Sequence, residues 1–126
     1  MLLNKIDMND VYNELLKEYA YPVTEWIWKI TGKSEYRAEN FIVKYDNESE
    51  GFQNHLKIHH DSSKFTFVLG LNDTYEGGGT WFPKQKILLD EPIGTLSVHP
   101  TLTHRHGARC VIEGVRYTLI SFVHKS

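Results

Sequence analysis

From Asn40 onward, the apolar side chains of this chain recur at every second position, which is the period of a β-strand with one buried face. The runs are short, and turn residues such as Asn, Asp and Gly separate them. The chain after Asn40 is therefore predicted to be all β. The strands are expected at about 41–45, 55–61, 64–72, 80–82, 86–89, 95–99, 102–106 and 115–124.

The segment before Asn40 has a helical period instead. Asn9 or Asp10 can cap a helix, and Pro22 is expected to end it. The segment 24–30 fits both a short helix and a strand, and we favour a helix that stops at Gly32. The apolar positions of the first helix lie three or four residues apart, at Val11, Tyr12, Leu15, Leu16 and Tyr19.

A chain of 126 residues is long enough for one domain with one hydrophobic core. We expect a single domain, with helical support over 9–32 and a β core over 40–124. Many short strands with tight turns behind a helical N-terminus favour a β-sandwich or a jelly roll, with the helices packed on one outer face. Trp26 and Trp28 are expected in its core.

The charge balance limits the partners of the chain. Its net charge is −2, and 24% of its residues are charged, so neither nucleic acid nor a membrane is an expected partner. One cysteine, Cys110, cannot form an intrachain disulfide, and the N-terminus lacks the apolar segment of a signal peptide. The default expectation is a cytoplasmic protein, unless the chain is an excised domain.

The sequence 58–61 carries the first candidate metal ligands. In a strand, His59 and Asp61 lie on one face while His60 points to the other. A third ligand would complete the two-histidine, one-carboxylate set that holds non-haem Fe(II). The best candidates are His104 and His106, which share a face, so alternation alone does not choose between them.

Arg116 opens the last predicted strand, ten residues after His106. Alternation places it on the same face as Thr118 and Ile120. A buried guanidinium without an anion is costly, and its fork of N–H groups can grip a carboxylate through two hydrogen bonds. Arg116 is therefore predicted to bind a carboxylate ligand.

These motifs stand in a longer series that runs from Phe41 to Val123, and it covers most of the chain. Its members are 41–45, 58–61, 65–66, 71–72, 77–80, 103–106, 114–117 and 121–123. The series resembles the 2-oxoglutarate and Fe(II)-dependent dioxygenases, in particular the group of procollagen lysyl hydroxylases and prolyl 4-hydroxylases. Its order and spacing are most similar to the lysyl hydroxylases.

The resemblance implies a mainly β fold, a double-stranded β-helix (jelly roll, cupin-like), behind N-terminal helices. It also implies that Arg116 binds the far carboxylate of 2-oxoglutarate, and that Tyr45 and Thr118 assist. His60 and His104 are then orienting or pocket-lining groups rather than ligands. The implied iron ligands are His59, Asp61 and His106.

The implied activity is hydroxylation of a carbon centre, with a lysyl or prolyl side chain of a polypeptide as the favoured substrate. Fe(II), 2-oxoglutarate, O2 and ascorbate are the implied cofactors and co-substrates, and succinate and CO2 the co-products. A free amino acid or another small molecule is the alternative substrate. Two alternatives from other classes are a metal-binding jelly-roll module without turnover and a Zn(II) hydrolase. Neither needs a carboxylate anchor such as Arg116.

Two features differ from the pattern of the family or need another explanation. The loop 46–54 is longer than in relatives, and 109–110 stands where they carry a nearby Pro, so both bear on the choice of substrate. The three glycines 77–79 are not followed by the Lys of a phosphate-binding loop. They are interpreted as backbone geometry.

Overall fold

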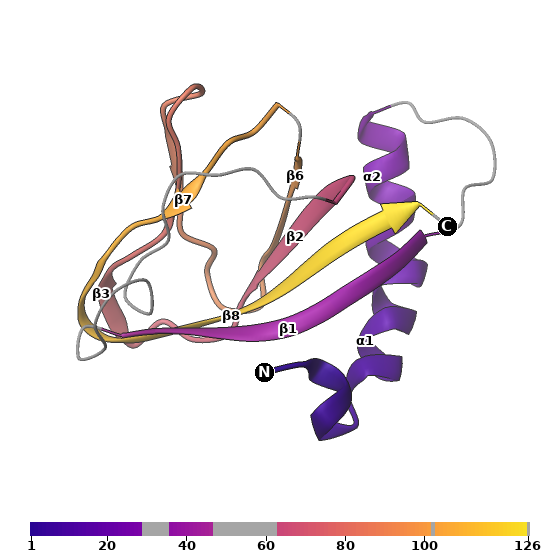
Figure 1. Ribbon diagram of the computed structural model, residues 1–126, viewed down its shortest axis with the longest axis horizontal. Coiled ribbons are helices and arrows are strands. Elements are labelled where there is room, and N and C mark those ends of the chain that lie inside the picture. The colour runs from indigo at the N-terminus through magenta and orange to yellow at the C-terminus, as the bar shows by residue number, and fades with distance from the viewer. Residues whose placement is uncertain (29–35, 47–62, 102, 126) are drawn as a thin grey trace.

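The computed structural model describes residues 1–28, 36–46, 63–101 and 103–125. Two sheets and an N-terminal helical segment make up this part of the chain (Figure 1). The helices lie across one face of the larger sheet, near the end of its longest strand, and the smaller sheet lies on the side away from them. The predicted arrangement of a β core with helices on one outer face is confirmed.

The helical segment is continuous over most of its length. After the short 3-10 turn η1 (Leu3–Ile6), α1 (Asn9–Leu15), the π-helical η2 (Leu16–Ala20) and α2 (Tyr21–Ile27) follow each other without a loop. The prediction that Pro22 ends the helix is therefore wrong.

The π-helical turn explains how the helix continues through Pro22. The N–H of Tyr21 donates to the carbonyl of Leu16, five residues back, so the turn before the proline is wider than an α-turn. Pro22 then occupies the first turn of α2, where its missing N–H and fixed φ are tolerated.

The predicted N-cap of the helix and the predicted burial of Trp26 are both wrong. Met8 rather than Asn9 or Asp10 is the N-cap. The region 24–27 is helical as favoured, whereas Gly32 lies outside the described residues. Trp28 stacks on Phe65 with ring centroids 5.4 Å apart, but Trp26 is 80% exposed and is not in the core.

The larger sheet has the order β1-β8-β2-β6, with β3 paired to β8, and the smaller sheet has the order β5-β4-β7. All pairings within the two sheets are antiparallel. The strands are β1 (Tyr36–Asp46), β2 (Phe65–Gly70), β3 (Tyr75–Gly77), β4 (Thr80–Phe82), β5 (Ile87–Leu89), β6 (Leu96–Pro100), β7 (Gly107–Ala108) and β8 (Val111–Lys125).

Most predicted strands are confirmed with shifted ends, and two predictions need correction. The region 103–106 is not a strand: only His106 makes a bridge, and β7 begins at Gly107. The last strand begins at Val111 rather than 115, because Gly114 adopts a φ of 80° inside it, opposite Tyr75 of β3. The predicted strand 55–61 lies outside the described residues.

The larger sheet has two different faces, which alternate along β8. Leu119 and Val123 face the helices and join the hydrophobic core with Phe65 and Phe67 of β2. Thr118, Ile120 and Phe122, which alternate with these residues, face the smaller sheet and line a cavity. The alternation therefore separates the structural core from the candidate site.

A buried polar contact fixes the helix to this sheet. The side chain of Asn40 donates to Asn9 Oδ1 at 3.0 Å and to Asn13 Oδ1 at 2.7 Å. Ser121 Oγ in turn donates to Asn40 Oδ1 at 2.7 Å. Asn9 thus bonds a strand residue instead of capping its own helix.

Two glycines with nearly equal positive φ angles, Gly94 at 78° and Gly114 at 80°, allow a test of the β3–β8 contact. A Cβ on Gly114 would lie 2.5 Å from the carbonyl oxygen of Thr74, whereas a Cβ on Gly94 would meet nothing within 4 Å. We expect Gly94→Ala to lower the free energy of unfolding by about 1 kcal/mol, from the left-handed φ alone. Gly114→Ala should lower it by about 3 kcal/mol, because strain and clash combine. Equal losses in urea unfolding would contradict the β3–β8 register.

Candidate functional site

A cavity of about 80 Å³ lies between the two sheets. Its floor is the face of the larger sheet that points away from the helices, and residues of β4 and β7 close the other side. Most of the lining is apolar, and the chemically active groups are few. The lining residues predicted from the sequence to act in the site are Tyr45, His106, Arg116 and Thr118.

His106 reaches the cavity from the short segment before β7. Its side chain is buried, and its Nδ1 lies 3.0 Å from the carbonyl oxygen of His104. A carbonyl can only accept, so Nδ1 carries the proton and a neutral ring keeps its lone pair on Nε2. The ring packs against Phe82 and His99, with centroids 5.6 Å and 4.6 Å away. His106 is thus held in the tautomer and orientation that metal ligation through Nε2 requires.

His104 does not line this cavity. Burial, followed by the charges of His99 and Lys84, lowers the pKa of its imidazole. Its contribution to His106 comes through the backbone carbonyl rather than the ring.

Arg116 is the central charged group of the cavity and is only 2% exposed. Its Nη2 donates to Glu91 Oε2 at 3.2 Å, and its Nε lies 3.8 Å from Asp90 Oδ1. The guanidinium carbon lies 5.4 Å from the centre of the Tyr45 ring, within the range of a cation–π contact. The guanidinium is buried, as predicted, and the chain itself supplies a buried carboxylate beside it, which was not predicted.

Gly78 makes room for the arginine. A Cβ at this position would lie 3.2 Å from Cδ of Arg116, and the residue has a φ of 74°. The neighbouring glycines Gly77 and Gly79 also have positive φ. The interpretation of 77–79 as backbone geometry is consistent with these values.

Two buried polar atoms beside the cavity lack a hydrogen-bond partner among the described residues. They are Nε of Arg116 and Oγ1 of Thr118, whose residue is 1% exposed. Buried polar atoms without partners are rare, and in a cavity they indicate a ligand that supplies the missing acceptor. Alternation along β8 places both side chains on this face, together with Ile120, as predicted.

The acidic partners of Arg116 were not identified from the sequence. Asp90 and Glu91 lie between the predicted strands 86–89 and 95–99 and were assigned no role, and Tyr75 was not placed in the site. In the structure, the Tyr75 hydroxyl donates a hydrogen bond to Asp90. Burial and the bond to Asp90 raise the pKa of the Tyr75 phenol to about 12, against the opposing effect of Arg116. The sequence does show two adjacent acidic residues, Asp90 and Glu91, directly before Pro92. Such a pair is common in exposed turns, so it did not point to a buried partner of Arg116.

The other two predicted metal ligands, His59 and Asp61, lie outside the described residues, as does His60. Within the described ranges, no group of three His, Cys, Asp or Glu side chains could hold a metal. A metal site that includes His106 therefore draws ligands from outside the described ranges, and His59 and Asp61 stay the predicted ones. The donor chemistry of His106 fits a metal that takes imidazole, and the Nε of Arg116, which has an ion pair with Asp90 but no hydrogen bond in the described part of the chain, fits a carboxylate co-substrate.

Along the stretches that the structure describes, no helix has the length and apolar character to cross a bilayer.

Comparisons with known proteins address the identity of the chain. No family model matches it. It is 32% identical to human procollagen-lysine,2-oxoglutarate 5-dioxygenase 2 and 33% identical to human multifunctional procollagen lysine hydroxylase and glycosyltransferase LH3. Both matches cover 96% of this chain but only 17% of the relative, so the chain spans about a sixth of the length of these proteins.

Solved structures show the fold. A viral collagen prolyl hydroxylase from Paramecium bursaria Chlorella virus 1, in complex with 2-oxoglutarate, matches with a TM-score of 0.63 at 15% identity, over 90% of this chain and 73% of that one. A 2-oxoglutarate–Fe(II) oxygenase family protein from Burkholderia pseudomallei matches with a TM-score of 0.61 at 22% identity, over 74% of this chain and 47% of that one. The chain is therefore a homologue of the procollagen-lysine 2-oxoglutarate 5-dioxygenases and has the jelly-roll fold of the 2-oxoglutarate–Fe(II) oxygenases.

Proposed function

We propose that the chain is an Fe(II)- and 2-oxoglutarate-dependent dioxygenase that hydroxylates a lysyl or prolyl side chain of a polypeptide. The observation that carries the proposal is the buried Arg116, which faces the same cavity as His106 in a chain homologous to lysyl hydroxylases. A metal-binding module without turnover would need the histidine but no buried arginine beside it.

The metal would be held by His106 through Nε2, together with His59 and Asp61. In the neutral ring, the hydrogen bond from Nδ1 to the carbonyl of His104 puts the lone pair on Nε2, and the rings of Phe82 and His99 restrict rotation of the imidazole. When bound, Fe(II) supplies coordination sites for 2-oxoglutarate and O2 and the redox chemistry that yields succinate and CO2.

Arg116 would bind the far carboxylate of 2-oxoglutarate through charge-assisted hydrogen bonds. Thr118 Oγ1 lies on the same face of β8 and would donate a further hydrogen bond. The guanidinium lies over the buried Tyr45 ring, which restricts its position. These residues orient the co-substrate, and the apolar lining around them keeps the charged contacts in a low dielectric.

The polypeptide substrate is supported by the names of the relatives, which are procollagen lysine hydroxylases, and of the viral structure, which is a collagen prolyl hydroxylase. A free amino acid or another small molecule remains the alternative substrate. Ascorbate belongs to the proposal as a reductant that sustains turnover.

We expect the purified chain to form succinate from 2-oxoglutarate only when Fe(II) and O2 are both present. A panel of lysyl and prolyl peptides, with the free amino acids as controls, should raise the rate for the true substrate, and ascorbate should prolong it. Mass spectrometry would locate the added oxygen atom. Hydrolysis with Zn(II) and no succinate would favour a hydrolase, and bound metal without any turnover would favour the binding module.

A paired substitution separates the two neighbouring histidines. His106→Ala should abolish binding of Mn(II) or Fe(II), measured by calorimetry, because it removes the ligand itself. His104→Ala should weaken binding much less, because its backbone carbonyl still accepts from Nδ1 of His106. Circular dichroism would establish that both variants are folded. Loss of metal in His104→Ala with retention in His106→Ala would overturn the ligand assignment.

A further inference from the structure

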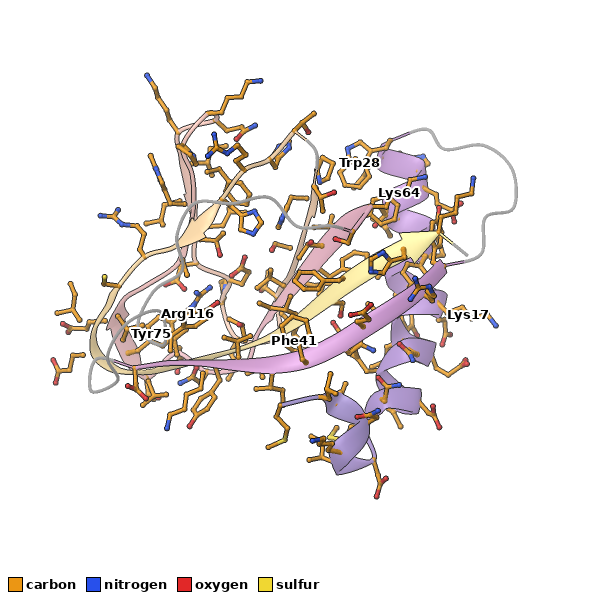
Figure 2. All side chains as sticks on the ribbon, viewed as in Figure 1. Lys17, Trp28, Phe41, Lys64, Tyr75 and Arg116 are labelled. Atoms are coloured by element: carbon orange, nitrogen blue, oxygen red, sulfur yellow. The ribbon has the colours of Figure 1, made fainter. Side chains whose placement is uncertain are left out.

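We propose that Glu91 is an internal competitor of the co-substrate, a residue that occupies Arg116 and lowers its affinity for a bound carboxylate. The inference rests on the proposed function and adds an affinity-determining residue to it. Figure 2 shows Arg116 and Tyr75 close together at the β3 end of the larger sheet, where the cluster around the guanidinium lies.

Both oxygens of the Glu91 carboxylate are engaged. Oε2 accepts from Nη2 of Arg116 at 3.2 Å, and Oε1 accepts from Oγ of Ser97 on β6 at 2.7 Å. The side chains of Glu91 and Arg116 are each only 3% exposed. A charge pair removed from water to this degree is weakly screened, so its members affect each other and any nearby ligand strongly.

The backbone holds Glu91 in this position. A Cβ on Gly70 of β2 would lie 2.4 Å from the carbonyl oxygen of Glu91, so the segment 90–94 packs directly on that strand. The N–H of Gly94 donates to the carbonyl of Gly70 at 2.9 Å, and Ile93 forms a bridge with the same residue. The backbone around Glu91 is therefore fixed against β2, and its buried side chain is held beside Arg116.

The carboxylates leave little of the positive charge for a ligand. Glu91 takes Nη2 and Asp90 lies 3.8 Å from Nε, whereas Nη1 belongs to neither ion pair. One guanidinium and two carboxylates sum to a net charge of −1. An arriving carboxylate must therefore share Arg116 with two like charges, and the buried one, Glu91, opposes it most.

Glu91 could instead strengthen binding by orienting the guanidinium. Other groups already restrict it, since the Tyr45 ring lies 5.4 Å from the guanidinium carbon and Gly78 packs beside Cδ. The loss of orientation on removing the Glu91 charge is therefore small. Repulsion between two carboxylates a few ångströms apart is the larger effect.

Glu91→Gln tests the inference, because glutamine keeps the shape and an oxygen that can accept from Arg116 while it removes the charge. Titration of 2-oxoglutarate into the Mn(II)-loaded chain should give a dissociation constant about tenfold lower than that of wild type, the scale expected for removing one close like charge. Glu113→Gln is the matched control, since it makes the same change of net charge at an exposed position of β8. It should change the constant less than about twofold, as expected for a solvent-screened charge.

Equal or weaker binding by Glu91→Gln would overturn the inference while leaving the proposed function intact. Absence of saturable binding by wild type and Glu91→Gln alike would overturn the proposed function itself, and the inference with it. Thermal unfolding would monitor the fold. If Glu91→Gln does not fold, Asp90→Asn replaces it, because this carboxylate is 45% exposed and should show a smaller tightening in the same direction. An unchanged constant for Asp90→Asn would then overturn the inference.

Discussion

Strand β8 contributes one face to the hydrophobic core and the other face to the candidate site, and the rest of the structure depends on this division. It pairs with β1 and β2 and, before Val115, with β3. One face supplies Leu119 and Val123 to the core under the helices, and the other supplies Arg116 and Thr118 to the cavity. A shift of one residue would exchange the two sets and bury the arginine against the helix, so the register of β8 fixes both the core and the site.

The buried ion pair between Arg116 and Glu91 is the second constraint. Burying two charges is expensive, and such a pair is seldom a net source of stability. Its retention in an otherwise apolar cavity is better explained by ligand binding, where a fixed guanidinium discriminates between anions and neutral molecules. The chain thus keeps a polar centre between its sheets, and Tyr45, Gly78 and Ser97 support it.

The features predicted well from sequence are those set by local period. Alternation placed Arg116, Thr118 and Ile120 on one face, and turn residues separated most strands near their observed ends. Alternation could not choose between His104 and His106, and the structure shows why the argument did not apply there. The chain at 103–105 is not a strand, and of the two histidines only His106 lines the cavity. The roles of His59 and Asp61 stay predictions.

The features that were missed depend on contacts between distant segments. Pro22 would end an isolated helix, but the π-helical turn before it and packing of Leu16 and Ala20 in the core let the helix continue. Glu91 became part of the site only because its segment packs on Gly70. Neither contact produces a periodic pattern in the sequence, so the tertiary structure was needed to identify them.

The central claim is that Arg116 binds the far carboxylate of 2-oxoglutarate, and titration of the co-substrate at saturating metal tests it most directly. Arg116→Ala should lose about 2–5 kcal/mol of binding free energy, as truncation of one partner of a buried charge pair does. Arg116→Lys should keep the charge, lose the planar fork and bind with intermediate affinity, while metal affinity changes little in either folded variant. Equal affinities of wild type and both variants for 2-oxoglutarate would show that Arg116 is structural, and the co-substrate assignment would be wrong.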